Sequence, residues 1–328
     1  MTPSHMTGRV VALDVGGTAM KGVVLSDGNA VEHFYGWPTP REDGPEQVER
    51  AVLAAVDELL EKSPDARAVG LVVPGLVDDH SGVAIFSENI GWRDVAFRSL
   101  VADRTGLPVG FGHDVRAGGL AERTIGAAQG ADDLLFMPIG TGISGAMYIA
   151  GHAVDNKYGG EIGHLDVGSG EACACGGVGC LETVATGPSI ARRYNALTGA
   201  SVSGAKPVVD RMVEGDPIAA RVWQDAIEAL SLALTAYVTL LAPELVVVGG
   251  GISAAGDLLL VPLREALRNR LVWQPEPRII LAALGENAAC LGAGLLARDS
   301  LKAALALKAA LALKAAPGAT DKDSRNKS

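Results

Sequence analysis

Several features that would indicate a nucleic-acid or membrane protein are missing from this chain of 328 residues. Aromatic residues make up only 4% of it, which is too little for a surface that stacks single-stranded nucleic acid. The net charge is −10, and the main body has no cluster of Lys and Arg of the kind that duplex binding needs. No run of about 20 apolar residues occurs. We therefore expect neither a nucleic-acid partner nor a membrane span.

The sequence also has little that would indicate secretion. Residues 1–8 are polar and lack the apolar core of a signal peptide, so we expect a cytoplasmic protein. There are only four cysteines, and three of them fall within residues 173–180. In a reducing compartment this clustering indicates metal binding rather than disulfides.

What is present is the composition of a well-packed enzyme, with 48% hydrophobic residues and 42 glycines. Short apolar runs alternate with segments whose apolar residues recur at helical spacing. This alternation predicts an α/β fold with largely buried sheets. Strands are expected at 10–13, 22–25, 68–73, 107–111, 134–139, 146–150, 245–248 and 278–282, and helices at 44–62, 115–124, 217–241 and from 288 onward. Strand-to-glycine turns near Asp14 and Gly140 indicate two similar lobes, with ligands between them.

The same pattern predicts where the lobes divide. Residues 1–115 with about 290–316 would form a smaller lobe, and 116–289 a larger one. Residues 301–316 repeat a unit of Ala, Leu and Lys, which are strong helix formers, so a helical extension is expected there. Six residues advance about 600° along a helix, so the lysines point to three sides and no membrane-binding face results. Residues 317–328 are expected to be disordered.

Two glycine-rich turns are candidates for phosphate binding. The candidates are Asp14, Gly16, Gly17, Thr18 and Lys21 in the first turn, and Gly140, Thr141 and Gly142 in the second. Glycines let backbone amides approach a phosphate closely, and Asp14 could hold Mg²⁺ through water. Either turn alone also fits a plain hairpin, and it is their pairing that favours phosphate. No GxxxxGK[ST] motif is present, so any nucleotide site has another design.

Asp114 follows a predicted strand and is the candidate general base. A kinase needs a carboxylate beside the acceptor hydroxyl to orient it and take its proton. A single Asp at the end of a strand is more often a helix cap, and the position alone does not separate the two roles.

A metal site is predicted by His164 together with Cys173, Cys175 and Cys180. Three thiolates and one imidazole suit tetrahedral Zn²⁺, and four protein ligands are typical of a structural site. Reduced cysteines without a metal are the alternative. Cys290 lies in an apolar helix and is expected to be ordinary core.

Together these motifs resemble the ROK family of bacterial sugar kinases and sugar-responsive repressors, over about residues 9–298. The resemblance is found in DVGGT at 14–18, GTGISG at 140–145, GEIGH at 160–164 and CACGGVGCLE at 173–182. It implies the two-lobe actin-like, ribonuclease H-like ATPase fold with a structural zinc loop. It also implies an ATP-dependent kinase that phosphorylates the 6-hydroxyl of a glucose-type hexose with Mg²⁺, and a homodimer.

The resemblance also implies individual roles. Asp114 matches the catalytic base, and the turn at 74–75 matches one that closes on the sugar. The positions that match sugar-side residues are Gly75, Asn89, His113, Asp114, Glu161, His164 and Glu182. The two glycine turns match the phosphate side, and Gly249, Gly250 and Gly251 match glycines beside the adenosine. His164 can serve both zinc and sugar, one ring nitrogen toward each.

His113 departs from the family, whose kinases usually have Asn before the catalytic Asp. An amide both donates and accepts, whereas a neutral imidazole does one of each in different directions. The exchange predicts altered selectivity at C3 or C4 of the sugar, and an amino sugar such as kanosamine (3-amino-3-deoxyglucose) becomes an alternative to glucose. The other possibility is that His113 only repacks and glucose still binds.

The motifs argue against two further functions. A sugar-sensing repressor of the same family would carry a helix-turn-helix domain ahead of residue 14, for which we expect no room. A non-catalytic zinc scaffold would not need both phosphate turns and Asp114. The motifs do not separate ATP from polyphosphate as the phosphate donor.

Overall fold

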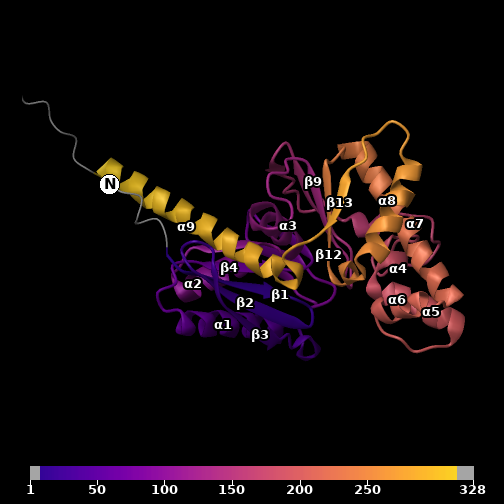
Figure 1. The fold of residues 1–328 in the computed structure, drawn as a ribbon. Coiled ribbons are helices and arrows are strands. Elements are labelled where there is room, and N and C mark those ends of the chain that lie inside the picture. Colours follow the sequence, from indigo (N-terminus) through magenta and orange to yellow (C-terminus); the bar gives the residue numbers. More distant parts are fainter. Residues whose placement is uncertain (1–7, 316–328) are drawn as a thin grey trace, which may run out of the picture.

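The computed structural model describes residues 8–315 and contains two five-stranded sheets (Figure 1). The first sheet has the order β3-β2-β1-β4-β8 and the second β11-β10-β9-β12-β13. The first comprises β1 (Val10–Val15), β2 (Ala19–Leu25), β3 (Val31–Pro38), β4 (Val69–Val73) and β8 (Val109–His113). The second comprises β9 (Leu134–Pro138), β10 (Ala146–Ile149), β11 (His152–Ala153), β12 (Leu245–Gly249) and β13 (Arg278–Leu281). Each strand expected from the sequence is present, and in most cases its observed ends lie within about two residues of the expected ones.

Parallel pairing aligns the ends of the central strands. In the first sheet β4 pairs in parallel with β1 and β8, and in the second β12 pairs in parallel with β9 and β13. The register places Asp14 opposite Val72, and Val73 opposite His113. Because parallel strands end at the same edge of a sheet, the residues that follow β1, β4 and β8 come together there.

Side chains of the central strands alternate between two helical layers, as the period of two in a strand requires. In β1, Val11 and Leu13 pack with α1 and α2, whereas Val10 and Ala12 pack with α3 and α9. These helices are α1 (Pro45–Lys62), α2 (Phe97–Thr105), α3 (Asp114–Ile125) and α9 (Ala288–Ala315). Burial on both faces explains why these strands are apolar without interruption.

The second sheet is covered mainly by five helices that lie between residues 182 and 270. They are α4 (Glu182–Ala185), α5 (Gly187–Thr198), α6 (Lys206–Val213), α7 (Pro217–Leu241) and α8 (Asp257–Arg270). The helices predicted at 44–62, 115–124 and 217–241 and from 288 are confirmed.

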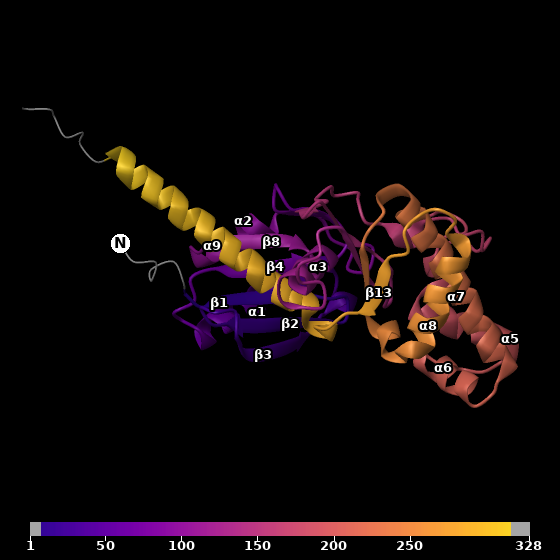
Figure 2. The ribbon, with the colours of Figure 1, turned by 45° about the horizontal axis from the view of Figure 1, so that its top comes forward.

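Helix α9 lies directly against the backbone of the first sheet. A Cβ added at Gly70 would lie 1.9 Å from the carbonyl oxygen of Ala293, and one at Gly110 would lie 2.3 Å from that of Leu296. Glycine at these two positions therefore allows the helix to lie this close. Both views show the far half of α9 leaving the body of the molecule, and there Leu307 and Leu311 are exposed (Figures 1 and 2). The predicted helical extension is thus confirmed up to residue 315, whereas 317–328 lie outside the described residues.

A small third sheet was not predicted. It comprises β5 (Leu76–Asp78), β6 (Val83–Phe86) and β7 (Arg93–Val95) in that order. Strands of three or four residues are too short to show a period of two in a sequence. The sheet matters because the turn between β6 and β7 carries Asn89. Among residues 8–315, no helix has the length and apolar character needed to cross a membrane.

Candidate active site

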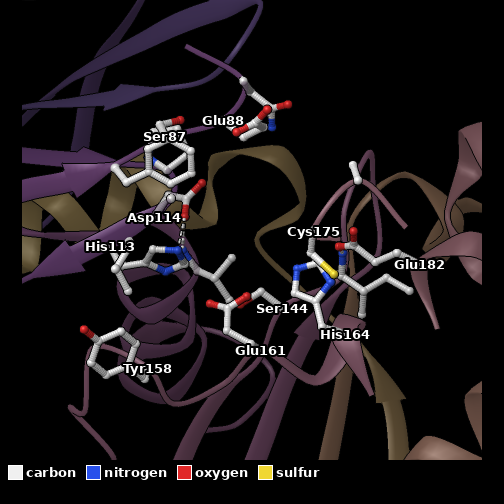
Figure 3. Close-up of a pocket in the computed structure, with 18 residues that line it drawn as sticks. Ser87, Glu88, His113, Asp114, Ser144, Tyr158, Glu161, His164, Cys175 and Glu182 are labelled. Atoms are coloured by element: carbon white, nitrogen blue, oxygen red, sulfur yellow. Dashed lines mark hydrogen bonds and ion pairs between the residues drawn. The ribbon is translucent and has the colours of Figure 1, made fainter. Parts of the chain in front are cut away.

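A cavity of ≈ 530 Å³ lies where the end of β8 in the first sheet and residues of the third sheet meet the turn that follows β9 and the loops between β11 and α4 (Figure 3). We call it the sugar-side cavity. Its lining includes all seven residues predicted for the sugar side: Gly75, Asn89, His113, Asp114, Glu161, His164 and Glu182. These residues span more than a hundred positions of sequence, and they come from the ends of strands, a β-turn and the loop that precedes α4.

Asp114 is both the first residue of α3 and part of the cavity wall. Its Oδ1 accepts a hydrogen bond of 2.7 Å from the backbone N–H of Val115, as a carboxylate at a helix N-terminus does. The carboxylate is partly exposed to the cavity. The N-cap of α3 is His113, so Asp114 is not the helix cap that its sequence position also suggested. Its carboxylate binds the first turn of the helix and also faces the cavity.

His113 is buried beside Asp114. Its Nε2 lies 3.3 Å from Asp114 Oδ1, while its Nδ1 is buried and has no hydrogen-bond partner among the described residues. An imidazole therefore lies next to the carboxylate. A ligand at this end of the cavity would meet a ring whose Nε2 is beside Asp114 and whose Nδ1 is buried.

Asp14 ends the apolar part of β1 and lies near Asp114. Burial, together with the negative charge of Asp114, raises the pKa of Asp14 to about 7, while Lys21 opposes the shift. Asp14 does not itself line the sugar-side cavity, but a carboxyl group whose pKa is raised in this way beside a cavity residue is a candidate for a functional site. Two neighbouring carboxylates favour a bound cation, which would relieve their repulsion.

The first glycine turn is held tightly between β1 and β2. The N–H of Gly16 donates to the carbonyl of Ala19 at 3.0 Å, and the Thr39 hydroxyl donates to the carbonyl of Gly16 at 2.7 Å. A Cβ on Gly17 would lie 3.9 Å from Cβ of Asn89, so this turn borders the sugar-side cavity. Thr18 is exposed.

Lys21 does not line the sugar-side cavity. Its Nζ forms an ion pair of 2.6 Å with Glu286 in the short helix η5 (Gly285–Asn287). The predicted contact of Lys21 with a phosphate stays a prediction, and it would require this ion pair to open.

The second glycine turn, residues 140–145, separates two cavities. Gly140 and Thr141 line a second cavity of ≈ 710 Å³, whereas Ile143 and Ser144 line the sugar-side cavity. We call the second one the nucleotide-side cavity. Gly251 also lines it, and its predicted contact with adenosine stays a prediction.

Gly249 and Gly250 support the nucleotide-side cavity from outside its lining. A Cβ on Gly249 would meet the ring of Phe136 at 3.1 Å. Gly250 has a φ of 74°, and a Cβ there would lie 2.4 Å from the carbonyl oxygen of Ile139. These two glycines therefore let the chain turn tightly beneath the cavity, and their contact with adenosine stays a prediction.

The four predicted metal ligands lie together. The donor atoms of His164, Cys173, Cys175 and Cys180 are all within 4.8 Å of one another. Sγ of Cys175 lies 3.7 Å from Sγ of Cys180, and Nδ1 of His164 lies 3.8 Å from Sγ of Cys173. Four ligands at bond lengths of about 2.0–2.3 Å around a tetrahedral ion give separations of this size. The cluster can therefore hold one metal ion, and His164 and Cys175 also line the sugar-side cavity.

Sequence reasoning missed several residues of the two cavities. Ser87, Glu88, Ser144 and Tyr158 line the sugar-side cavity, and the nucleotide-side cavity is completed by Gly187, Asn195 and Lys206 from α5 and α6. Ser144 lies inside the motif GTGISG quoted above, and Glu88 directly precedes Asn89, so both could have been found from the sequence. Tyr158 and the residues of α5 and α6 carry no local signal.

Comparisons with known proteins agree with this geometry. The sequence pattern of the ROK family matches residues 10–300. A glucokinase of Thermotoga maritima is 31% identical over 89% of this chain and 98% of its own length. A kanosamine kinase of Amycolatopsis mediterranei is 32% identical over 90% of this chain and 96% of its own. The solved structure of a ROK family glucokinase from Streptomyces griseus in complex with glucose and AMPPNP is 30% identical, with a TM-score of 0.77 over 89% of this chain and 100% of that one.

The chain therefore belongs to the ROK family. The α/β actin-like fold of a sugar kinase is confirmed by the solved relative, and so is the predicted enzyme class, a sugar phosphotransferase.

The raised pKa of Asp14 predicts a pH-dependent effect of Asp14→Asn on stability. An Asp in the unfolded chain titrates near 3.9, so the wild type loses stability as the pH rises from about 4 to about 7, where folded Asp14 ionises. The side chain of the Asp14→Asn variant is a neutral amide, so it causes no loss of stability over this pH range. We expect Asp14→Asn to gain about 2 kcal/mol more, relative to wild type, at pH 8 than at pH 5, since one pKa unit corresponds to about 1.4 kcal/mol.

The free energies of unfolding would be measured by denaturant titration at both pH values, without Mg²⁺ or nucleotide. Asp103→Asn, on an exposed position of α2, is the control and should differ from wild type equally at both. The same stability difference for Asp14→Asn at pH 5 and pH 8 would contradict the assignment.

Proposed function

We propose that this chain transfers the γ-phosphoryl group of ATP to the 6-hydroxyl of a glucose-type hexose, with Asp114 as the general base. One observation carries the proposal: the turn at 140–145 has one end in the nucleotide-side cavity and the other in the sugar-side cavity. A nucleotide and a sugar in these two cavities would meet at this turn. The glucokinase relatives support the sugar class.

In the proposed reaction Asp114 accepts the proton of the sugar hydroxyl as the oxygen attacks the γ-phosphorus in line. Backbone N–H groups of the two glycine turns would stabilise the charge on the transferring group. Mg²⁺ bound with ATP would neutralise part of that charge, and Asp14 is the carboxylate placed to hold it, through water. Asn89, Glu161 and Glu182 would bind the other sugar hydroxyls.

Zn²⁺ is the metal we propose for the cluster of His164, Cys173, Cys175 and Cys180. Four protein ligands leave no open position, which is typical of a structural ion. The ion would hold the segment from Glu161 to Glu182 in shape beside the sugar. The homodimer and the lobe boundaries at 115 and 289 stay predictions.

The alternative substrate is an amino sugar such as kanosamine. It is supported by His113, which lines the sugar-side cavity beside Asp114, and by the 32% identity to a kanosamine kinase. The relatives include enzymes named for both sugars, so the two must be compared by experiment.

Asp114→Asn should lower kcat by about 10²–10⁴-fold, since this is the usual contribution of a general base. The dissociation constant for the sugar should change much less, because the amide keeps the size and one acceptor oxygen of the carboxylate. ADP release and sugar titration would measure the two effects, with Asp103→Asn as the control. Near-normal turnover of Asp114→Asn would show that another group takes the proton.

His113→Asn tests which sugar the cavity prefers. If the imidazole selects the amine, the ratio of kcat/KM for kanosamine to that for glucose should fall about tenfold or more, within the range that one pocket contact provides. A coupled ADP-release assay with both sugars measures the ratio. An unchanged ratio would mean that His113 only fills space, and glucose would then be favoured.

Cys173→Ser should lower the metal content from about one zinc ion per chain to well below one, because a hydroxyl is a poor ligand for zinc. The temperature of unfolding should fall with it. Cys290→Ser is the matched control: its thiol lies outside the cluster, buried in α9, and donates to the carbonyl of Lys21 at 3.2 Å, which a hydroxyl can also do. Elemental analysis of purified protein decides, and an unchanged zinc content in Cys173→Ser would rule out the site.

A further inference from the structure

Glu182 contacts two functional parts of the molecule at once. Its side chain lines the sugar-side cavity (Figure 3). Its Oε1 also accepts a hydrogen bond of 2.5 Å from the backbone N–H of Ile143, in the middle of the second glycine turn. The same carboxylate that lines the sugar-side cavity therefore holds the turn that borders the nucleotide-side cavity.

The contact is closely packed. A Cβ on Gly142 would lie 2.8 Å from Oε1 of Glu182, and a Cβ on Gly163 would lie 2.8 Å from its Cγ. Neither glycine has a positive φ, so it is the lack of a side chain, and not an unusual backbone, that these positions provide. The carboxylate is thus enclosed between the turn and the segment that carries Glu161 and His164.

The backbone of Glu182 is itself fixed. Its carbonyl accepts a hydrogen bond of 2.6 Å from the hydroxyl of Ser189, the N–H of Leu181 donates to the carbonyl of Leu165 at 2.9 Å, and the hydroxyl of Thr183 donates to the carbonyl of Cys180 at 2.7 Å. The side chain therefore reaches the turn from a rigid base.

The ends of the glycine turn are held mainly by the backbone. The N–H of Gly187 donates to the carbonyl of Gly140 at 3.2 Å, and the N–H of Gly145 donates to the carbonyl of Gly160 at 2.7 Å. The middle of the turn has a backbone bond from the N–H of Gly140 to the carbonyl of Gly142 and a bridge between residues 139 and 143, and the Glu182 side chain binds the N–H of Ile143 in addition. A change in the position of this side chain would therefore displace the part of the turn that lies between the two cavities.

We propose that Glu182 is a positioning residue that couples binding of the sugar to binding of the phosphate donor. The inference rests on the proposed function. A sugar hydroxyl that donates to Glu182 would restrict its carboxylate in the orientation that holds Ile143. The turn would then lose less freedom when the donor binds, so each ligand would tighten the binding of the other by the same factor.

The test is calorimetric titration of Mg²⁺ and AMPPNP, with and without saturating sugar, glucose or kanosamine according to which is turned over. In wild type we expect the sugar to tighten AMPPNP binding about fivefold or more. Glu182→Asp keeps the charge but withdraws it by one methylene, so the factor should fall toward one. Gly142→Ala, which displaces the carboxylate from the side of the turn, should lower the factor as well.

Glu161→Asp is the matched control. Glu161 lines the same cavity, but its carboxylate has no hydrogen bond to residues 140–145 within the described part of the chain. It should weaken sugar binding and yet keep the coupling factor once sugar is saturating. Glu182→Gln, which retains an acceptor at the same length, should keep more of the factor than Glu182→Asp.

A wild-type factor of one, an unchanged factor in Glu182→Asp, or an equal loss in Glu161→Asp would each overturn the coupling role while leaving the kinase assignment intact. The absence of turnover with any hexose or amino sugar would overturn the proposed function, and this inference with it.

Discussion

The site depends on the parallel pairing of the central strands. β1, β4 and β8 end at one edge of the first sheet, and β9 and β12 end together in the second. Chain leaving these ends must turn at the edges, which is where ligands bind in open α/β sheets. Asp14, the turn at 74–75 and Asp114 follow from the first set of ends, and the turns at 140–145 and 249–251 from the second.

The structure also requires backbone segments to approach one another closely, and glycine allows this both in the fold and at the site. Gly70 and Gly110 let α9 lie on the first sheet, whereas Gly142 and Gly163 make room for the carboxylate of Glu182. The first pair serves the fold and the second the site. A side chain at any of these positions would separate parts that must touch, because protein interiors have no free volume to absorb it.

Charge around Asp114 is unevenly balanced. The negative charge of Asp114 raises the pKa of Asp14, and Lys21, which forms an ion pair with Glu286, offsets this only in part. Such an arrangement costs stability in the free protein. It is also the arrangement that a cation bound with a phosphate donor would relieve, so the cost is consistent with a site built for a charged ligand.

Much of the fold could be predicted because the central strands are apolar throughout and end in glycine or aspartate. The small third sheet was missed because its strands are too short to show a pattern, and α5 and α6 because their apolar residues do not form a long periodic run. Glu182 was predicted as a sugar ligand from its place after Cys180, but its bond to Ile143 joins residues 39 positions apart and has no signal in the sequence.

By itself, the sequence determined the chemistry available: which carboxylates, thiolates and glycine turns the chain possesses, since these are properties of residue types and short spacings. Only the tertiary structure decided which of them share a cavity, because that depends on strand order and on packing between distant segments. It brought the seven sugar-side residues together, directed Lys21 to Glu286, and placed the turn at 140–145 between two cavities. Local patterns cannot encode such contacts, since each is made by partners that lie far apart in the chain.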